Sequence, residues 1–139
     1  MIIRTVGEVV AGRELATVQP SDTVEAACKV LATADVGALA VVEGDQLVGV
    51  ISERDVIQRA ICRGRPTADT AVSDVMTPDP KVIGRGASLS EALTQMIEGR
   101  FRHLPVVEAG AVTAMLSIRD IPTEYRLMVE RYREYTEPA

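Results

Sequence analysis

Hydrophobic and polar positions along the chain follow one pattern twice. Apolar residues recur every three or four positions over 23–34 and again over 88–98, which predicts two amphipathic helices. Each helix is followed by a nearly continuous apolar segment, a short polar turn and a second apolar segment, which predicts a buried β-hairpin. The remaining predicted elements, first copy and then second, are helical turns at 6–9 and 72–76, strands at 15–18 and 81–83, strands at 38–42 and 104–107, and strands at 47–51 and 112–116. A last helix is expected to begin at Ser52 and at Ser117, so each copy has the order β-α-β-β-α.

The two copies also align residue by residue. A shift of 65 positions superimposes residues 17–56 on the second half without a gap, and residues 52–55 (SERD) then fall on 117–120 (SIRD). Self-similarity at a fixed spacing indicates a duplicated structural unit. We therefore divide the chain into a first repeat, 1–65, and a second repeat, 66–139, which ends in an additional helix.

The duplication itself predicts how the repeats pack. A three-stranded sheet that is covered by helices on one face leaves its other face exposed, so one repeat cannot bury its core alone. The predicted fold class is therefore mixed α+β, with tandem β-α-β-β-α repeats packed sheet to sheet as one module. The additional helix, over 123–136, is expected to place a stripe on the module or on a second subunit. That stripe consists of Tyr125, Met128, Val129 and Tyr132.

Composition narrows the classes of function. The 139 residues carry a net charge of −5, whereas nucleic-acid-binding proteins normally present a basic face to phosphates, so no nucleic-acid partner is expected. No apolar run approaches the roughly 18–20 residues that span a bilayer, and the N-terminus lacks the features of a signal peptide. We therefore expect a cytoplasmic protein without a membrane partner. Cys28 and Cys62 do not form a C-x-x-C pair and are expected to be reduced and structural.

Polar side chains with potential chemistry gather where the second strand of each hairpin meets the last helix. Ser52 and Ser117 stand at these junctions, each followed by Arg two residues later and by Asp three residues later. One interpretation is helix capping, in which Ser and the acid three residues on form a capping box. The other is ligand binding, because a helix N-terminus suits an anion and a carboxylate can accept hydrogen bonds from a vicinal diol such as that of ribose. The recurrence of Arg in both copies favours ligand binding over capping alone.

These junctions, together with residues 102–107 (RHLPVV) and 74–78 (DVMTP), resemble the cystathionine-β-synthase (CBS) domain pair, also called a Bateman module. The resemblance covers nearly the whole chain. It implies two clefts where the paired sheets meet, which in this family commonly take adenosine-containing ligands: AMP, ADP, ATP, S-adenosylmethionine or NAD(H). It also implies a regulatory homodimer that is not an enzyme, has no catalytic cofactor and controls an unidentified protein in trans.

The resemblance further implies a role for individual residues. Asp55 and Asp120 would hold ribose. The residues that would face phosphate are Ser52, Arg54, Ser117, Arg119 and, in the second copy only, Arg102 and His103. Backbone and apolar side chains near four strand positions would sandwich adenine, namely Val18, Leu39, Ile83 and Leu104.

The two expected sites are not equivalent in sequence. Residues 102–103 (Arg-His) stand where the first copy has residues 37–38 (Gly-Ala), so phosphate recognition is expected to be better supplied in the second site. Conversely, Gly49 of the first copy is replaced by Ala114, which would alter the second site if the ligand had to approach the backbone there. We expect Asp120 to mark the tighter site.

An enzyme and a purely structural module are the two alternatives to a nucleotide sensor. A catalytic triad of Ser117, His103 and Asp120 would use a serine that caps a helix, and the sequence marks neither an oxyanion hole nor a nucleophile elbow. His103 is the only histidine, so no metal site is expected, and no glycine-rich phosphate loop is present. The remaining alternative is a structural or dimerisation module whose clefts stay empty and whose Ser and Asp residues act only as caps.

Overall fold

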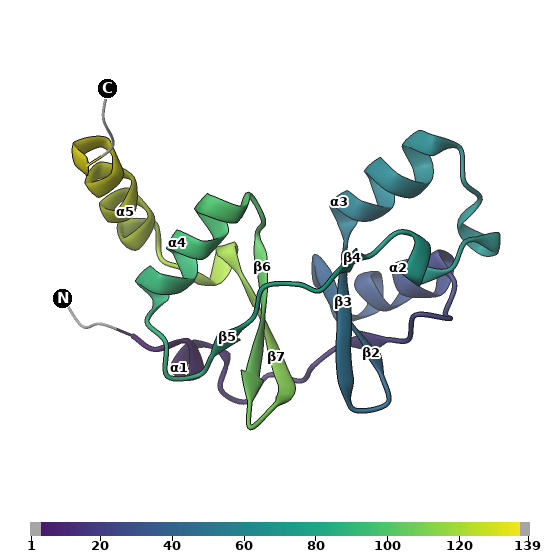
Figure 1. Ribbon diagram of the computed structural model, residues 1–139, viewed down its shortest axis with the longest axis horizontal. Helices are drawn as coiled ribbons and strands as arrows, with labels where there is room; N and C mark the ends of the chain where they lie inside the picture. Colours follow the sequence, from purple (N-terminus) through teal and green to yellow (C-terminus); the bar gives the residue numbers. More distant parts are fainter. Residues whose placement is uncertain (1–3, 137–139) are drawn as a thin grey trace.

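The chain folds into two α+β units whose sheets face each other in the middle, with helices on the outer sides (Figure 1). The computed structural model describes residues 4–136, and side chains as far as residue 132. The elements of the first half are α1 (Val6–Val10), β1 (Thr17–Val18), α2 (Val24–Ala34), β2 (Ala38–Glu43), β3 (Gln46–Ser52) and α3 (Glu53–Asp55), which continues as a π-helical turn (Val56–Ala60) and a 3₁₀ turn (Ile61–Arg63). Two 3₁₀ turns follow, Thr67–Asp69 and Val72–Asp74. The second half contains β4 (Thr77–Pro78), β5 (Ile83–Gly84), α4 (Leu89–Gly99), β6 (His103–Glu108), β7 (Ala111–Ser117), a 3₁₀ turn (Ile118–Asp120) and α5 (Thr123–Thr136).

The sheet topology confirms the duplicated α+β fold. In each half a short strand runs parallel to the first strand of a hairpin, which gives the orders β1-β2-β3 and β5-β6-β7. The hairpins share their register, because Ala38 pairs with Ser52 and the equivalent His103 pairs with Ser117. A fourth strand, β4, extends the first sheet by pairing antiparallel with β3.

The two long helices form where periodicity predicts them, and local capping explains where they begin. The Thr23 side chain accepts a hydrogen bond from the backbone N–H of Ala26 at the start of α2. Ser88 and Glu91 form a reciprocal capping box at the start of α4, with hydrogen bonds of 3.1 Å in both directions. Each helix then buries one apolar face against its own sheet.

The layer between the two sheets is made of residues that belong to neither core. Strand residues point alternately to the two faces of a sheet, so Leu39 and Val41 enter the core of the first unit while Ala38 and Ala40 point the other way. Ala38 and Ala40 are nevertheless buried, and β2 and β3 both contact β7 of the other unit. Their small side chains let the sheets approach closely, which confirms the predicted sheet-to-sheet packing.

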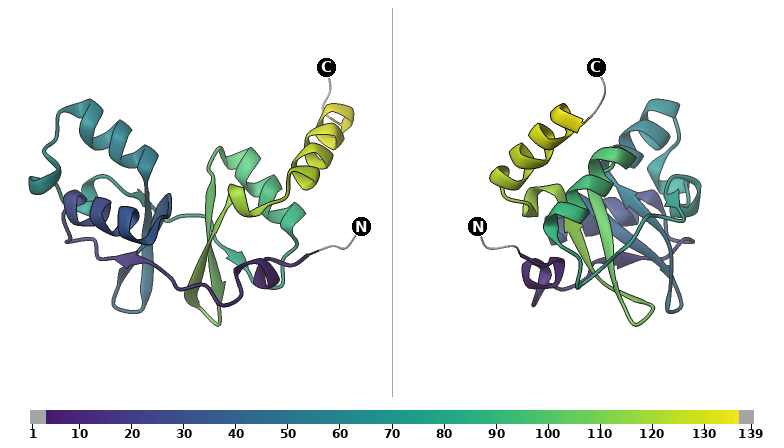
Figure 2. Two further views of the ribbon diagram at one scale, coloured as in Figure 1. Left: turned by 180° about the vertical axis from the view of Figure 1, so that it is seen from behind. Right: turned by 60° about the vertical axis from the view of Figure 1, so that its left-hand side comes forward.

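The units exchange the segments that lead into them, as the two crossings of the chain in Figures 1 and 2 show. Helix α1 precedes the first unit in sequence but packs in the core of the second, and the amide of Val6 donates to the carbonyl of Ala87 at 2.8 Å. The turn Val72–Asp74 packs in the core of the first unit, where the amide of Val72 donates to the carbonyl of Asp22 at 2.8 Å. Each core therefore contains residues from both repeats of the sequence.

The last helices of the two copies differ because of one proline. After Ser52 the helical segment continues through α3 to Arg63. After Ser117 it stops as a single 3₁₀ turn, since Pro122 lacks an amide hydrogen and holds the preceding residue in an extended conformation. The helix predicted to begin at Ser117 is therefore only a 3₁₀ turn, whereas the additional helix predicted over 123–136 forms as α5.

Helix α5 covers part of the second unit, as its stripe of apolar residues predicts. The Tyr125 side chain is buried in the core of that unit, and Val129 packs against it, whereas Met128 and Tyr132 are exposed. Within residues 4–136, no helix combines the length and apolar character that crossing a bilayer requires.

Gly49 is required by strand β4 rather than by a ligand. A Cβ atom at this position would lie 2.5 Å from the sulfur of Met76 and 2.9 Å from the carbonyl oxygen of Thr77. The equivalent Ala114 is tolerated because no fourth strand pairs with β7. The difference between Gly49 and Ala114 therefore reflects the extra strand of the first sheet, and it gives no reason to expect a weaker second site.

We predict that Gly49→Ala lowers the free energy of unfolding by about 1–3 kcal/mol, because the backbone of Thr77 has to move. Urea-induced unfolding followed by circular dichroism measures this loss. Gly84→Ala is the matched control, since a Cβ on Gly84 of β5 meets nothing within 4 Å. Equal stabilities of the two variants would contradict the explanation.

Candidate functional site

The two strand-to-helix junctions lie at the same end of the molecule. Both hairpins have their turns at the opposite end, as Figures 1 and 2 show. Equivalent backbone hydrogen bonds tie each junction to the start of the neighbouring strand: the amide of Glu53 donates to the carbonyl of Gly37 at 3.0 Å, and the amide of Ile118 donates to the carbonyl of Arg102 at 2.8 Å. The sequence repeat is thus a structural repeat down to single hydrogen bonds at the candidate site.

Both junctions contain the capping box that the sequence allows. At the first, the Ser52 amide donates to Asp55 Oδ2 at 3.0 Å, and the Asp55 amide donates to Ser52 Oγ at 3.1 Å. At the second, the Ser117 amide donates to Asp120 Oδ2 at 2.8 Å, while Ser117 Oγ accepts from the amide of Arg119 at 3.3 Å. Capping uses one oxygen of each carboxylate. Because an ionised carboxylate offers about four lone-pair positions, capping does not exclude a ligand.

The carboxylate of Asp55 has weak partners on its remaining sites. Thr77 Oγ1 lies 3.3 Å from Oδ1 and 3.4 Å from Oδ2, and the nearest guanidinium nitrogen, Arg59 Nε, lies 3.9 Å from Oδ1. Arg59 is directed mainly at the backbone, donating to the carbonyl of Met76 at 2.9 Å. The Asp55 side chain is 13% exposed, so one edge of the carboxylate remains accessible.

The carboxylate of Asp120 is more strongly engaged. Arg13 Nη1 donates to Oδ2 at 2.7 Å and Arg13 Nη2 donates to Oδ1 at 2.9 Å, which is the bidentate geometry of a guanidinium–carboxylate pair. The hydrogen bond to Asp120 is the main cause that raises the pKa of Arg13. Asp120 is therefore part of an ion pair and a cap, and this geometry does not orient His103 as a catalytic triad would require.

His103 lies at the boundary between the two units. A Cβ atom on Gly37 would be 3.1 Å from His103 Nε2 and 3.0 Å from Glu53 Oε1, so the absence of a side chain at Gly37 makes room for both groups. Burial lowers the pKa of His103; Glu53 and Asp120 act against this effect, whereas Arg119 and Arg102 reinforce it. The imidazole is therefore neutral near pH 7 and surrounded by charges of both signs.

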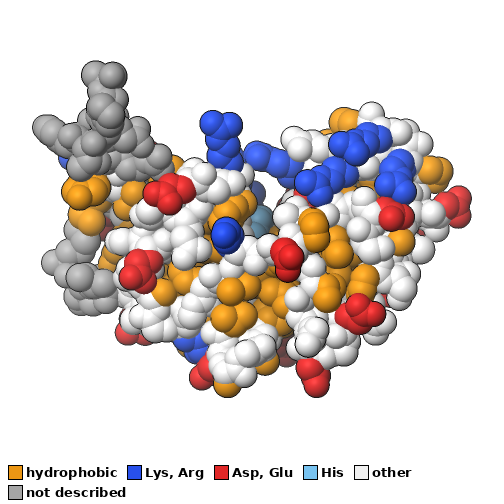
Figure 3. All heavy atoms as spheres, in the orientation of Figure 1, with side chains coloured by type: hydrophobic (Ala, Val, Ile, Leu, Met, Phe, Trp, Pro, Cys, Tyr) orange, Lys and Arg blue, Asp and Glu red, His pale blue; other side chains and the backbone are white. Residues whose placement is uncertain are grey.

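Basic side chains lie beside the junctions and are exposed. Arg54, Arg102 and Arg119 form no ion pair with any side chain of residues 4–132. Figure 3 shows the surface hollowed between the two units, with Lys and Arg side chains along the edge of the hollow. An acidic protein thus presents exposed guanidinium groups without an ion-pair partner beside the two junctions, and such groups can bind an anion.

The four residues expected to sandwich adenine are buried in the two cores. Leu39 and Leu104 have no exposed surface, and Val18 and Ile83 are almost fully buried. These four side chains face the helices of their own unit, and an adenine contact near them stays a prediction. Only the backbone at these positions is left as a possible contact for a ligand.

Two residues at the site were missed by the sequence reasoning. Arg13 contacts Asp120 and belongs to no motif, whereas Thr77, which contacts Asp55, lies in the segment 74–78 (DVMTP) but was assigned no role there. Arg13 lies on the segment that crosses from α1 to the first sheet, and Thr77 lies on β4, just before the chain crosses to β5. The exchange of these segments brings together residues 107 positions apart in the case of Arg13 and Asp120, so no local pattern could reveal the contact.

Fold and site together define a class of protein: a tandem α+β module with two equivalent Ser-x-x-Asp junctions in one hollow between its sheets. Comparison with known families identifies this class. The CBS domain matches residues 6–61 and 72–124. The chain belongs to the CBS domain family.

Relatives and solved structures agree with this assignment. The chain is 38% identical over 103 residues to the CBS domain-containing protein CBSCBSPB1 of Arabidopsis thaliana, covering 73% of this chain and 19% of that protein. It is 37% identical to the mitochondrial CBS domain-containing protein CBSX3 of the same plant, covering 81% of this chain and 56% of that protein. The chain thus spans about a fifth of CBSCBSPB1 and about half of CBSX3.

Solved structures with the same fold include a putative signal-transduction protein with CBS domains from Burkholderia ambifaria, with a TM-score of 0.80 and 28% identity over 97% of this chain and 98% of that one. They also include a CBS domain protein from Pyrobaculum aerophilum complexed with AMP, with a TM-score of 0.79 and 22% identity over 91% of this chain and 98% of that one. At 22% identity, the similarity to the Pyrobaculum aerophilum protein shows only that the two proteins share a fold.

The lowered pKa of His103 predicts a pH dependence of stability. Below its ordinary value of 6.5 the unfolded chain binds a proton that the folded protein does not yet bind, so the free energy of unfolding falls as the pH decreases from 6.5 toward the folded pKa. His103→Gln should remove this part of the pH dependence. Because His103 is the only histidine, its NMR titration in the folded protein and in urea measures both pKa values directly. A folded midpoint at or above the unfolded one would contradict the prediction.

Proposed function

We propose that this chain is a regulatory module, not an enzyme, that binds an adenine nucleotide in the hollow between its two units. The observation that carries the proposal is the meeting of two Ser-x-x-Asp junctions beside three exposed guanidinium groups in an otherwise acidic protein. The guanidinium groups of Arg54, Arg102 and Arg119 supply donors for phosphate, and the carboxylates supply acceptors for the ribose diol. AMP, ADP, ATP and NAD(H) all contain both groups.

The AMP complex of the Pyrobaculum aerophilum protein supports the choice of ligand class, since it shares this fold. The asymmetry of the hollow supports the proposal that the second site recognises phosphate more strongly. Arg102 and His103 stand there beside the junction, whereas the first site has Gly37 and Ala38 in the same places. His103 would gain a proton when a phosphate binds beside it, because a negative charge favours the imidazolium form.

The output we propose is a change in how the two units, and two copies of the chain, are arranged. A nucleotide that prefers one arrangement shifts the population toward it, and a protein target in trans reads the change. A cytoplasmic location is part of the same proposal.

A structural module with empty clefts is the competing function, and the capping boxes favour it because they explain Ser52, Ser117 and both aspartates without a ligand. It does not explain why Arg102, Arg119 and His103 stand beside the second junction. A thermal-shift screen against AMP, ADP, ATP, NAD, NADH and S-adenosylmethionine separates the two functions, since a ligand that binds the folded state raises the melting temperature. The nucleotide proposal expects a rise with at least one of them, and the structural alternative expects none.

We predict that Asp120→Ala weakens nucleotide binding roughly tenfold to a hundredfold, because a charge-assisted hydrogen bond to a ribose hydroxyl contributes about 1.5–3 kcal/mol. Isothermal titration calorimetry with the nucleotide found in the screen measures the loss. Stability should fall by about 1 kcal/mol through the lost cap and by roughly 0–1 kcal/mol more through the lost ion pair with Arg13.

Glu91→Ala is the matched control for this variant. It removes the acid of the capping box of α4, which has the same hydrogen bonds but lies away from the hollow between the units. We expect the loss of stability of a broken cap, about 1 kcal/mol, and an unchanged affinity. Equal affinities of the Asp120→Ala and Glu91→Ala variants would leave the ribose role without support.

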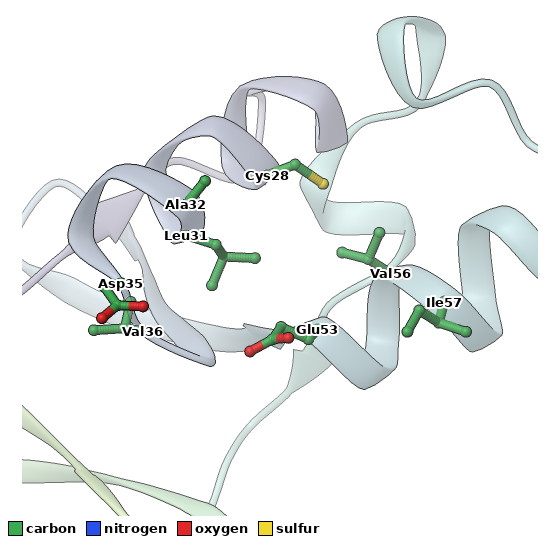
Figure 4. Close-up of a pocket in the computed structure, with 8 residues that line it drawn as sticks. All are labelled: Cys28, Leu31, Ala32, Asp35, Val36, Glu53, Val56 and Ile57. Atoms are coloured by element: carbon green, nitrogen blue, oxygen red, sulfur yellow. The ribbon is translucent and has the colours of Figure 1, made fainter.

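The proposed homodimer has a candidate interface on the first unit. Figure 4 shows Leu31 of α2 and Val56 facing each other across a groove of about 370 Å³ that is also lined by Cys28 and Ile57. Large apolar residues remain exposed around it, including Val36, Ile57 and Ile61. Contiguous apolar surface of this kind is typical of a protein interface, and we propose that a second copy covers it.

We predict that the protein sediments as a dimer and that Ile57→Glu shifts it to a monomer, because a buried carboxylate would be unpaired in the interface. Analytical ultracentrifugation measures the change. Val82→Glu is the control, since Val82 is another exposed apolar residue and lies outside the groove. A native monomer, or an Ile57→Glu variant that stays dimeric, would contradict this assignment of the interface.

A further inference from the structure

The Arg13–Asp120 ion pair occupies the group that a nucleotide would need. Both carboxylate oxygens of Asp120 accept hydrogen bonds from the Arg13 guanidinium, at 2.7 and 2.9 Å, and Oδ2 also accepts from the Ser117 amide. The Asp120 side chain is only 15% exposed, whereas Arg13 is 41% exposed. A ribose diol that approaches from solvent therefore meets the guanidinium before it meets the carboxylate.

The first half of the chain provides an internal comparison. Asp55 occupies the equivalent position, and the contact from the crossing segment is a single hydroxyl, Thr77 Oγ1, at 3.3–3.4 Å. A weak neutral contact of this kind is easily replaced by a ribose hydroxyl. Asp120 instead has a charged, bidentate partner, which a neutral diol cannot match. The two sites thus differ in access as well as in phosphate recognition.

Arg13 also lies on the segment that connects the two units, so its release from Asp120 would affect both of them. It lies between α1, which is anchored on the second unit, and β1, which belongs to the sheet of the first. The amides of Val6 and Gly7 bond to the second unit at 2.8 and 2.9 Å, so α1 stays docked when Arg13 moves. Within the part of the chain that the structure describes, the contact of Arg13 with Asp120 is the only side-chain hydrogen-bonding contact of the segment 11–16.

We propose that Arg13 competes with the ligand for Asp120. The Arg13 guanidinium must leave the Asp120 carboxylate before ribose can bind there. The inference rests on the nucleotide-binding function proposed above and adds a regulatory contact to it. The competition lowers the apparent affinity of the second site by the fraction of molecules in which the ion pair is closed. Ligand binding then releases the segment 11–16, which connects the two units, and so couples occupancy of the site to their arrangement.

Adenosine is the sharpest probe of this competition, because it carries the ribose diol but no phosphate with which Arg13 could form a new pair. Arg13→Gln should bind adenosine about three to ten times more tightly than the native protein, as expected for removal of a partly exposed ion pair. Arg13→Lys, which keeps the charge but cannot form the bidentate pair, should lie between them. Arg63→Gln removes one positive charge from an exposed position on the first unit and should leave the affinity unchanged.

Salt provides a second measurement on the same proteins. Raising the ionic strength screens the ion pair, so the affinity of the native protein for adenosine should increase between 0.05 and about 0.5 M NaCl. The affinity of Arg13→Gln should change little over that range. Hydrogen exchange of the amides over 11–16 should also quicken when adenosine is added to the native protein.

The outcomes separate this inference from the function on which it rests. If Arg13→Gln binds adenosine no more tightly than the native protein, or if neither binds it, the competition is overturned. In that case the nucleotide proposal stands as long as AMP binding is weakened by Asp120→Ala, and it falls as well if AMP binding is absent or insensitive to that substitution. Tighter adenosine binding by Arg13→Gln, with the native affinity for Arg63→Gln, establishes the competition.

Discussion

The contact between the two sheets completes both units and determines how the candidate site is assembled. Each sheet is covered by helices on one face only, and its other face is buried solely by the opposite sheet. Small residues such as Ala38 and Ala40 line that contact and bring the strands of the two units close together. This packing also brings Ser52 and Ser117 to the two sides of one hollow, so the candidate site is a consequence of how the core is completed.

Much of the fold could be predicted because local sequence patterns determine it. The helices α2 and α4 and both hairpins follow from apolar periodicity and turn residues, and the duplication follows from a constant spacing of 65 residues. The exchange of α1 and of the turn Val72–Asp74 between units could not be predicted, since a short apolar turn packs equally well on either equivalent core. Pro122 interrupts the helix after Ser117, and the equivalent residue of the first copy is Ile57, so a helix inferred from the repeat was not expected to stop there.

The Ser and Asp residues of the candidate site could be predicted from the sequence motif, but the residues that contact them could not. Ser52, Asp55, Ser117 and Asp120 do meet at strand-to-helix junctions, as their spacing predicts. The side chains of Leu39 and Leu104 are turned away from the hollow, because strand alternation assigns them to the cores. Arg13 reaches Asp120 only through the exchanged segment.

In the proposed function these carboxylates act as caps and as ribose acceptors at the same time. A crystal structure of the protein grown with AMP tests this dual role. We expect ribose hydroxyls within hydrogen-bond distance of the Asp120 carboxylate, phosphate beside Arg102 or Arg119, and the Arg13 guanidinium turned away. AMP bound elsewhere, or an empty hollow in which Arg13 still holds Asp120 at saturating AMP, would contradict it.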